Sequence, residues 1–305
     1  MIANKHILNE VELTFTTEQN QREFELDLLE QRLLQNEDYS KAVNQIATLE
    51  FDLQKAQFFG NEALAEKIEQ EIKHYKSLKE KLRLELGFDD TQITKPCPIC
   101  GGTGHNENGY CKCFVKRATA LSYKELSTDI PTLSRFSDDT LSHVNGTKIY
   151  FEKLHKYADN LNENSKNIII TGKTGTGKTF LAQAVSQSME DKKVVLFLNA
   201  NRLNNIFIEM MYLSPQQQNN ILNILYTCDF LVIDDLGAER ILNNVTAQNL
   251  YTIISERQER KKPYMITTNL SLDEIGAKYG DRLFSRLSSR LNLVLELKGS
   301  DLRKS

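Results

Sequence analysis

A glycine-rich loop in the second half of the chain has the residue types and spacing of a Walker A motif: Gly172, Lys173, Thr174, Gly175, Thr176, Gly177, Lys178 and Thr179. Its glycines let backbone N–H groups turn toward one anion, and the positive end of a following helix adds to the attraction. Lys178 brings a full positive charge to the β- and γ-phosphates, and the Thr179 hydroxyl is placed to bind Mg²⁺. Because the apolar run 167–171 precedes the loop as a strand should, the loop predicts a site for ATP and Mg²⁺.

A pair of carboxylates follows further along the chain, where the apolar run 230–233 ends in Asp234 and Asp235. A buried strand that ends in acids is typical of a Walker B motif, in which one acid holds the Mg²⁺ shell and another activates water. We assign the first role to Asp234 and the second to Asp235, with Glu239 as the reserve candidate for the water-activating carboxylate. The alternative is that the two acids only cap a helix, since Leu236 and Gly237 follow them.

A polar residue also follows the strand expected over 263–268. Ligands of open parallel sheets bind beyond the carboxyl ends of the strands, so Asn269 is positioned to contact the γ-phosphate or its attacking water. Taken alone, an asparagine after a strand is a turn residue. The role of Asn269 therefore depends on the motifs around it.

Four of the five cysteines lie within seventeen residues, as two close pairs: Cys97, Cys100, Cys111 and Cys113. A Cys-x2-Cys knuckle with a Gly-Gly turn, closed by a second cysteine pair, supplies four soft ligands for a tetrahedral Zn²⁺. Four protein ligands leave no open position, so such a site is structural rather than catalytic. In the main variant His105 replaces Cys111 or Cys113 as a ligand. The fifth cysteine, Cys228, precedes an apolar strand and is expected in the core.

Strands and helices alternate from residue 167 onward. The expected strands are the apolar runs 167–171, 194–198, 229–234, 263–268 and 292–296. This alternation predicts an α/β fold in which helices cover both faces of a parallel sheet.

The first part of the chain differs in charge and pattern. Residues 1–96 hold 12 Lys/Arg against 19 Asp/Glu, whereas residues 97–305 hold 26 against 22. Apolar residues between Gln21 and Leu86 recur at helical spacing with a break near Gly60, which predicts antiparallel helices. Their apolar stripe is either the core of a small bundle or a surface for a partner helix. Only the basic second part is a candidate for binding nucleic-acid phosphates.

Composition narrows the class of protein. The chain has 305 residues, of which 40% are hydrophobic and 26% charged, which excludes disordered and fibrous classes. Its amino terminus lacks an export signal, and no apolar run approaches the roughly 20 residues of a membrane span. We therefore expect a soluble, cytoplasmic protein without a membrane partner.

Four segments together resemble the AAA+ initiator and helicase-loader clade: Gly172–Thr179, Ile233–Glu239, Thr267–Leu270 and Asp281–Leu287. They correspond to Walker A, Walker B, sensor one and the box that carries the arginine finger, and the likeness covers roughly residues 130–305. Within the clade the chain is most similar to the DnaC/DnaI-type loaders of the replicative helicase, which share these motifs with IstB-like ATP-binding proteins. The cysteine knuckle after a helical segment is similar to loaders with a zinc-bound, helicase-binding amino-terminal domain.

The resemblance implies an ATPase that works on a larger assembly. Its implied partners are a hexameric replicative DNA helicase, single-stranded DNA and, when ATP is bound, further copies of the chain. Arg286 would be the arginine finger that reaches the γ-phosphate of a neighbouring subunit, with Arg282 as its support. The segment 201–227 would line a DNA channel, although Arg202 is its only cation. The family pattern also implies an ATPase domain without a C-terminal helical lid, and Arg303 lies in a tail similar to the family's ending.

We expect four parts in chain order. These are a helical partner-binding segment over 1–90, a zinc knuckle over 91–118, a linker and helix over 119–166, and the AAA+ ATPase domain over 167–305. The preferred interpretation is an ATP-dependent loader of the replicative helicase. A transposition accessory ATPase similar to IstB is the second interpretation, and an ATP-responsive adaptor with little hydrolysis is the third.

Overall fold

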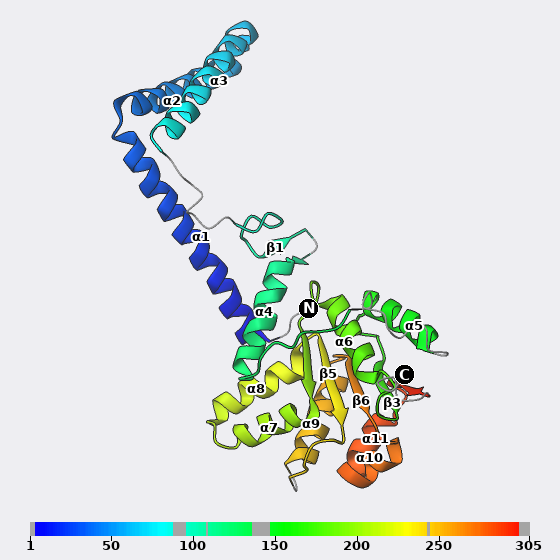
Figure 1. Cartoon of the computed structure of the whole chain (residues 1–305). Coiled ribbons are helices and arrows are strands. Elements are labelled where there is room, and N and C mark those ends of the chain that lie inside the picture. Colours follow the sequence, from blue (N-terminus) through cyan, green and yellow to red (C-terminus); the bar gives the residue numbers. More distant parts are fainter. Residues whose placement is uncertain (1–3, 88–95, 108, 136–146, 243–244, 299–305) are drawn as a thin grey trace. The chain divides into compact units, whose positions relative to one another are not determined.

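The computed structural model describes residues 4–87, 96–107, 109–135, 147–242 and 245–298 (Figure 1). Helices precede an α/β part in which strands and helices alternate. The helices are α1 (Lys5–Leu34), α2 (Glu37–Phe58), α3 (Glu62–Glu85), α4 (Lys112–Glu125), α5 (Thr147–Asp159), α6 (Lys178–Met189), α7 (Ala200–Met210), α8 (Pro215–Thr227), α9 (Thr246–Glu259), α10 (Leu272–Tyr279) and α11 (Asp281–Leu287). The strands are β1 (His105–Asn106), β2 (Gly109–Tyr110), β3 (Asn167–Gly172), β4 (Val195–Asn199), β5 (Phe230–Leu236), β6 (Tyr264–Thr268) and β7 (Asn292–Leu297).

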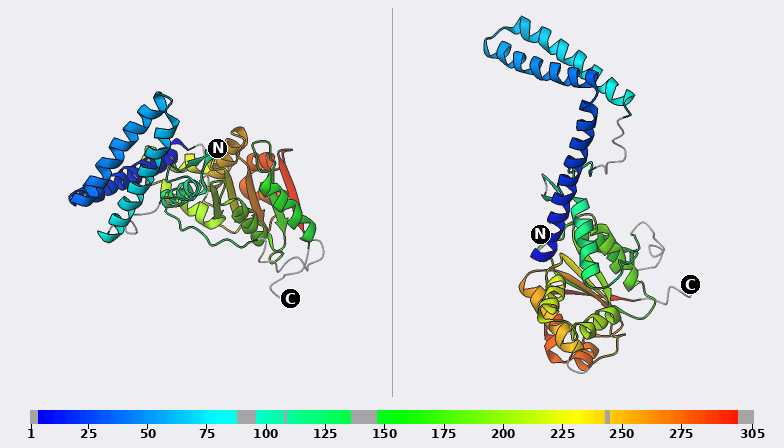
Figure 2. Two further views of the ribbon diagram at one scale, coloured as in Figure 1. Left: turned by 90° about the horizontal axis from the view of Figure 1, so that it is seen from above. Right: turned by 90° about the vertical axis from the view of Figure 1, so that its left-hand side faces the viewer.

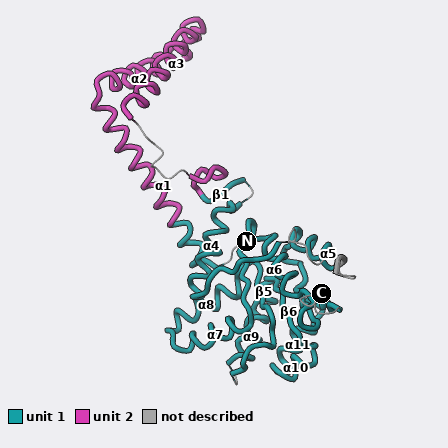
Figure 3. Tube along the Cα trace, viewed as in Figure 1, with its two compact units in different colours: residues 1–13, 104–305 teal, residues 14–103 magenta. Residues whose placement is uncertain are grey.

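The chain falls into two compact units, coloured separately in Figure 3. One unit comprises residues 14–103, and the other comprises residues 1–13 and 104–305. In the described part of the chain, no helix combines the length and the apolar character that a membrane crossing requires.

The unit of residues 1–13 and 104–305 is built on a five-stranded sheet in the order β4-β5-β6-β3-β7. Every neighbouring pair in this sheet is parallel, which confirms the predicted α/β fold. The chain moves one way across the sheet from β3 to β4 and the other way through β5, β6 and β7. Because parallel crossovers are right-handed, α6 covers one face and the helices after β4 cover the other.

Alternation along the strands supplies both halves of the core. Ile168 and Ile170 of β3 pack with Leu181 and Val185 of α6 on one face, and Leu154 of α5 joins them. Ile169 points to the opposite face and is also fully buried. The sheet is therefore apolar on both faces, as parallel sheets require.

The reversal of strand order beside β3 fixes where a ligand can bind. Ligands of open α/β sheets bind at such a switch point, beyond the carboxyl ends of the strands. The residue that ends β3, Gly172, has a φ of 148°, and a Cβ there would lie 2.5 Å from the Leu297 carbonyl oxygen. Only glycine therefore lets β7 run this close to the start of the phosphate loop.

The unit of residues 14–103 contains an antiparallel hairpin of α2 and α3, which Figure 2 shows side by side. Asn36 and Asn61 cap the two helices by accepting the backbone N–H groups of Tyr39 and Leu64. The helical segment begins earlier than the periodicity predicted, at Lys5, and has an additional break before α2. Ile7, Val11 and Phe15 recur every four residues in the first half of α1 and are buried, a helical signal that the sequence analysis did not use.

The apolar stripe of the hairpin is core. Leu49 and Ala56 of α2 are buried against Ile68 and Ile72 of α3. This packing resolves the two interpretations of the stripe, because the periodic positions face each other within the hairpin. A charged contact ties α1 to it, since the Lys79 ammonium lies 2.9 Å from a Glu30 carboxylate oxygen, which also accepts the Tyr39 hydroxyl.

A buried cation joins elements of the α/β unit. The Arg257 side chain of α9 is fully buried and donates to the carbonyl oxygens of Leu225, Cys228 and Pro263 at 2.7–3.0 Å. It also donates to the Cys228 thiol at 3.1 Å, and Cys228 is buried as predicted. Arg257 thus satisfies carbonyl groups at the end of α8 and before β6 that would otherwise lack donors.

We expect Arg257→Met to destabilise this unit by roughly 3 kcal/mol, because three buried carbonyl groups lose their donors. The thermal midpoint should fall by about 10 °C for a domain of this size. Arg260→Met is the matched control, because Arg260 is half-exposed in an i,i+4 pair with Glu256, which is worth little. Equal thermal midpoints for the two variants, measured by circular dichroism, would contradict this role of Arg257.

Candidate functional site

The predicted phosphate loop lies between the carboxyl end of β3 and the first turn of α6. Gly175 and Gly177 have φ values of 82° and 89°, in the left-handed region that glycine adopts without strain. The Thr176 hydroxyl donates to the Lys173 carbonyl oxygen at 2.9 Å and closes the turn. Such a turn directs successive backbone N–H groups inward, beside the positive end of a helix.

Lys178 is almost fully buried at the start of α6. Its ammonium donates to the carbonyl oxygens of Gly172 and Lys173 at 2.7 and 2.8 Å, and to Asn269 Oδ1 at 2.6 Å. The charge is therefore held inside the loop by neutral acceptors. An anionic phosphate is a stronger partner for it than a carbonyl oxygen.

Thr179 and Asp234 are brought together across the sheet. The Thr179 hydroxyl lies 3.0 and 3.1 Å from the two Asp234 carboxylate oxygens. A hydroxyl and a carboxylate in contact are the hard oxygen ligands that Mg²⁺ binds together with phosphates. The donor set thus fits the predicted magnesium shell.

Thr267 orients the acids, a role that the sequence did not reveal. Its hydroxyl donates to Asp234 Oδ1 at 2.6 Å and accepts the backbone N–H of Asp235 at 2.8 Å. Burial raises the pKa of the Asp234 carboxyl; the Thr267 and Thr179 hydroxyls oppose that rise, and Asp235 adds to it. A bound cation would favour the ionised carboxylate.

Asp235 has an unusual backbone. Its φ is +57°, and the register between β5 and β6 shifts between Ile233 and Leu236. An L-residue in this region is strained, and such strain is concentrated at functional sites. The shift lets consecutive acids avoid strict alternation, and Asn269 Nδ2 donates to Asp235 Oδ1 at 3.1 Å.

Asn269 therefore bridges two predicted site residues, with its oxygen on Lys178 and its nitrogen on Asp235. The structure places Lys178, Asp235 and Asn269 in one connected network at the carboxyl edge of the sheet. A pocket of about 430 Å³ opens beside it, lined by Gly172, Lys173, Asn269 and Glu274 among others.

The reserve acid lies in a different environment. Glu239 is 4% exposed, accepts the backbone N–H of Gly237 at 2.9 Å and accepts the Tyr279 hydroxyl. These donors occupy both of its carboxylate oxygens. This geometry gives Glu239 a structural role and leaves Asp235 as the better-placed candidate for contact with water.

Arg286 lies on α11, and its guanidinium sits over the Tyr251 ring of α9, 5.8 Å from the ring centre. A hydrogen bond from Arg286 lowers the pKa of the exposed Tyr251 hydroxyl, and the Arg286 charge acts in the same direction. The Arg286 carbonyl accepts from Gln258 and Asn292. Arg282 is exposed on the same helix. The predicted role of Arg303 lies outside the described residues.

Arg202, the single cation of the expected DNA channel, is bound by acceptors of the same chain. The Arg202 guanidinium donates to Glu209 at 2.7 Å and to the carbonyl oxygens of Leu126 and Ser127 at 2.9 and 2.8 Å. Its Nε donates to the Thr128 hydroxyl. Arg202 therefore joins α7 to the segment after α4. Its N–H donors are occupied by these acceptors, so it is poorly available to a DNA phosphate.

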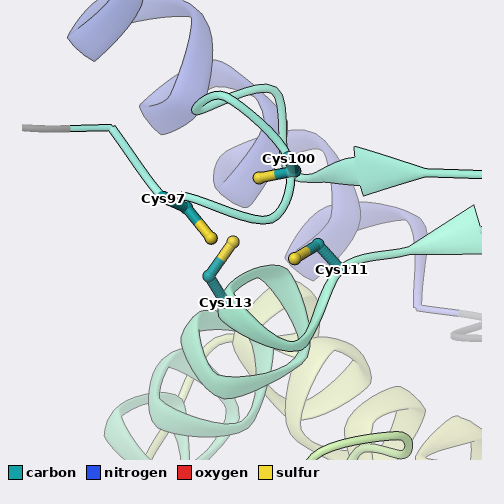
Figure 4. Close-up of side chains that lie close together, drawn as sticks. All are labelled: Cys97, Cys100, Cys111 and Cys113. Atoms are coloured by element: carbon teal, nitrogen blue, oxygen red, sulfur yellow. The ribbon is translucent and has the colours of Figure 1, made fainter.

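The four cysteines of the knuckle are assembled as predicted from their spacing. The Sγ atoms of Cys97, Cys100, Cys111 and Cys113 all lie within 4.8 Å of one another, and Figure 4 shows them pointing toward a common centre. Tetrahedral Zn²⁺ with bonds of ~2.3 Å separates its sulfur ligands by about 3.8 Å, so the four thiols fit a closed zinc site.

His105 lies elsewhere in the knuckle. Its ring packs 5.0 Å from the Tyr110 ring and 5.5 Å from the Phe114 ring. Among the described residues, the set of cysteines that could hold a metal consists of the four knuckle cysteines and does not include His105. The structure thus favours the four-cysteine set over the variant with His105.

Comparisons with known proteins find similarity in the part of the chain that contains this site. Residues 153–304 match the family model described as IstB-like ATP binding protein. The replicative helicase loader DnaC of Buchnera aphidicola is 27% identical over 151 residues, which cover 49% of this chain and 61% of that protein. DnaC of Escherichia coli K12 is 27% identical over 142 residues, covering 44% and 55%. The matched region thus spans somewhat more than half the length of these two relatives.

A solved structure, the crystal structure of the DnaC helicase loader, is 23% identical, with a TM-score of 0.46. It covers 54% of this chain and 97% of that chain. The similarities to DnaC cover about half of the chain, and the family model locates the match in the part that contains the phosphate loop and the acid pair. Residues 153–304 are therefore similar to the IstB-like ATP-binding proteins.

Proposed function

We propose that this protein is an ATP-dependent loader of a hexameric replicative DNA helicase. The observation that carries the proposal is the network from Lys178 through Asn269 to Asp235, in a domain whose relatives are named replicative helicase loaders. Nucleotide-binding loops alone occur in many classes of protein. The added acid and its asparagine partner are the parts that hydrolysis requires.

The proposed chemistry divides the site into holding and reacting groups. Lys178 and the loop N–H groups bind the β- and γ-phosphates, and Thr179 and Asp234 hold Mg²⁺, which neutralises phosphate charge. Asp235 orients the attacking water and accepts its proton. Without nucleotide, Asn269 donates its amide N–H to the Asp235 carboxylate, and with ATP bound it turns to contact the γ-phosphate or the water.

Arg286 is the proposed finger, acting on ATP held by a second copy of the chain. Its contact with the Tyr251 ring keeps the guanidinium at the surface of α11 in a partly exposed position. A guanidinium supplied by a neighbour stabilises charge in the phosphoryl transition state, so hydrolysis waits for assembly.

The helical hairpin is the proposed helicase-binding arm. Phe58 and Phe59 at its turn are 85% and 78% exposed, and their rings contact each other edge to face. Large exposed aromatic side chains that serve no core are typical of protein-binding surfaces. The zinc knuckle is proposed to be structural, holding the segment after this arm in a defined conformation.

The family description favours one further candidate, an accessory ATPase of a transposition system. Its specific support is the match of residues 153–304 to the IstB-like model. Such a protein should prefer double-stranded DNA and bend it, whereas a loader should prefer single strands. A gel-shift and bending assay with matched duplex and single-stranded probes separates the two.

The loader proposal predicts helicase binding through the hairpin turn. The full chain should form a complex with the hexameric replicative helicase of its own organism and promote ATP-dependent helicase delivery onto coated single-stranded DNA. Phe58→Ala with Phe59→Ala should weaken the complex at least tenfold, because both rings lose their contact area. Leu84→Ala is the control, since Leu84 is equally exposed on α3 away from the turn. Absence of any complex with the wild-type chain would rule the loader out.

The trans arrangement predicts complementation between inactive variants. Arg286→Ala should retain ATP binding but lose turnover by about 10³-fold, and Asp235→Asn should do the same for a different reason. A mixture of the two should regain part of the ATPase rate, because mixed interfaces pair an intact finger with an intact acid. Lys178→Ala should instead lose ATP affinity. A mixture that stays inactive at every ratio would argue for a finger that does not act between subunits.

The knuckle predicts one Zn²⁺ per chain by elemental analysis. Cys97→Ser and Cys111→Ser should each lose the metal, since three thiolates hold zinc far less tightly than four. Cys228→Ser should keep the full zinc content, because Cys228 lies against Arg257 in the α/β core. Stoichiometric zinc in the Cys97→Ser protein would exclude the four-cysteine site.

A further inference from the structure

A basic pocket lies at the amino ends of the strands, whereas the phosphate loop lies at their carboxyl ends. Its volume is about 270 Å³, and it is lined by the segment 163–167 before β3, by residues 257–258 and 261–263 at the end of α9 and before β6, and by Arg290 and Leu291 before β7. These segments all lead into the amino ends of parallel strands. The phosphate loop follows the carboxyl end of β3, so the two sites are separated by the length of the sheet.

The charge at this pocket is unbalanced. Lys166, Lys261 and Arg290 line it with exposed side chains, and Glu163 is the one carboxylate among its lining residues. Lys262, the third lysine of the lining, is paired with buried Asp229 at 3.0 Å. Three exposed cations against one carboxylate leave an excess of positive charge in this concave lining, which attracts anions.

The buried guanidinium of Arg257 also belongs to this pocket. Arg257 is fully buried, and its Nε finds no hydrogen-bond partner among the described residues, although its other nitrogens are satisfied. Arg257 also lines the pocket. A fixed positive charge that the fold leaves with a spare donor adds to the attraction of the exposed cations.

Lys261 occupies a backbone position that favours glycine. It follows the end of α9 with a φ of 52°, and its backbone N–H donates to the Gln258 carbonyl oxygen at 3.2 Å. The left-handed position after a helix is most often glycine, because a Cβ there is strained. A lysine at this position therefore costs stability, and its charge is the property that glycine lacks.

Three observations favour a nucleic-acid backbone as the source of the anion. The single cation of the expected DNA channel, Arg202, is occupied by Glu209 and by carbonyl groups, so DNA phosphates need cations elsewhere. The lining of the basic pocket contains no aromatic ring, so it suits phosphates rather than stacked bases. Leu291, 54% exposed beside Arg290, offers an apolar contact for a sugar.

We propose that Lys166, Lys261 and Arg290 bind the phosphate backbone of single-stranded DNA, without sequence preference. This inference rests on the proposed function only in its choice of DNA as the source of the phosphate. It adds a DNA contact at the amino ends of β3, β6 and β7, away from the ATP site.

The test compares two triple variants of the full chain. The first carries Lys166→Gln, Lys261→Gly and Arg290→Gln. Glycine at position 261 relieves strain while it removes the charge, so loss of binding cannot be assigned to loss of folding. The control carries Lys124→Gln, Lys153→Gln and Lys192→Gln, which remove three exposed charges from α4, α5 and the turn after α6. Binding to fluorescent oligo-dT and to a fluorescent ATP analogue is measured by anisotropy at several salt concentrations.

We expect the first variant to bind oligo-dT at least tenfold more weakly than wild type, with unchanged ATP affinity. The slope of log affinity against log salt should fall by about 2, since each single-strand phosphate contact contributes about 0.7. The control variant should keep both the slope and most of the affinity. Pyrophosphate should compete with oligo-dT only weakly, because a small anion cannot engage several cations along a strand.

Three results would overturn the inference. If wild type binds oligo-dT and the first variant binds it equally well, the pocket is not a DNA site, and the loader proposal still stands. If pyrophosphate binding depends on the three cations but oligo-dT binding does not, the pocket holds a small anion instead. If wild type binds no single-stranded DNA at all, both this inference and the DNA part of the proposed function fail.

Discussion

The site depends on the register with which β6 pairs with its two neighbours. Thr171 of β3 and Leu236 of β5 both pair with Thr268, so the ends of all three strands meet at one level. This alignment sets Asn269 between Lys178 and Asp235, and Thr267 beside Asp234. A slip of one residue would turn Thr267 to the other face and separate both acids from their donors.

The same register explains why the acids can be adjacent in sequence. Consecutive residues of a regular strand point to opposite faces, which would send Asp234 and Asp235 apart. The positive φ of Asp235 and the shift after Ile233 break this alternation. The Thr267 hydroxyl stabilises the distorted backbone, because it accepts the Asp235 N–H while donating to Asp234. The strain is thus confined to the residue that contacts Asn269.

Local patterns were sufficient to predict the strands, the loop and the cysteine cluster. Each depends on residues that are close in sequence, such as Gly172 to Thr179 or Cys97 to Cys113. The partners that neutralise a side chain could not be predicted, because they come from distant segments. Glu239 is occupied by Tyr279, forty residues away, and Arg202 by carbonyl groups of the segment after α4. The sequence therefore shows which side chains are charged, but not which of them are already paired within the fold and so unavailable to a ligand.

At the carboxyl ends of the strands, the cation of the phosphate loop and the candidate catalytic acid share one hydrogen-bonding partner, which can couple anion binding to the state of the acid. At the carboxyl edge, Lys178 is held by Asn269 Oδ1, while the amide nitrogen of the same side chain holds Asp235. An anion that draws Lys178 toward the loop must weaken the first bond, because the ammonium exchanges a neutral acceptor for a charged one. Asn269 is then free to turn toward the anion, and Asp235 loses a donor that competes with water for its oxygen. Binding in the loop would thereby alter the acid by way of one side chain, without movement of the strands.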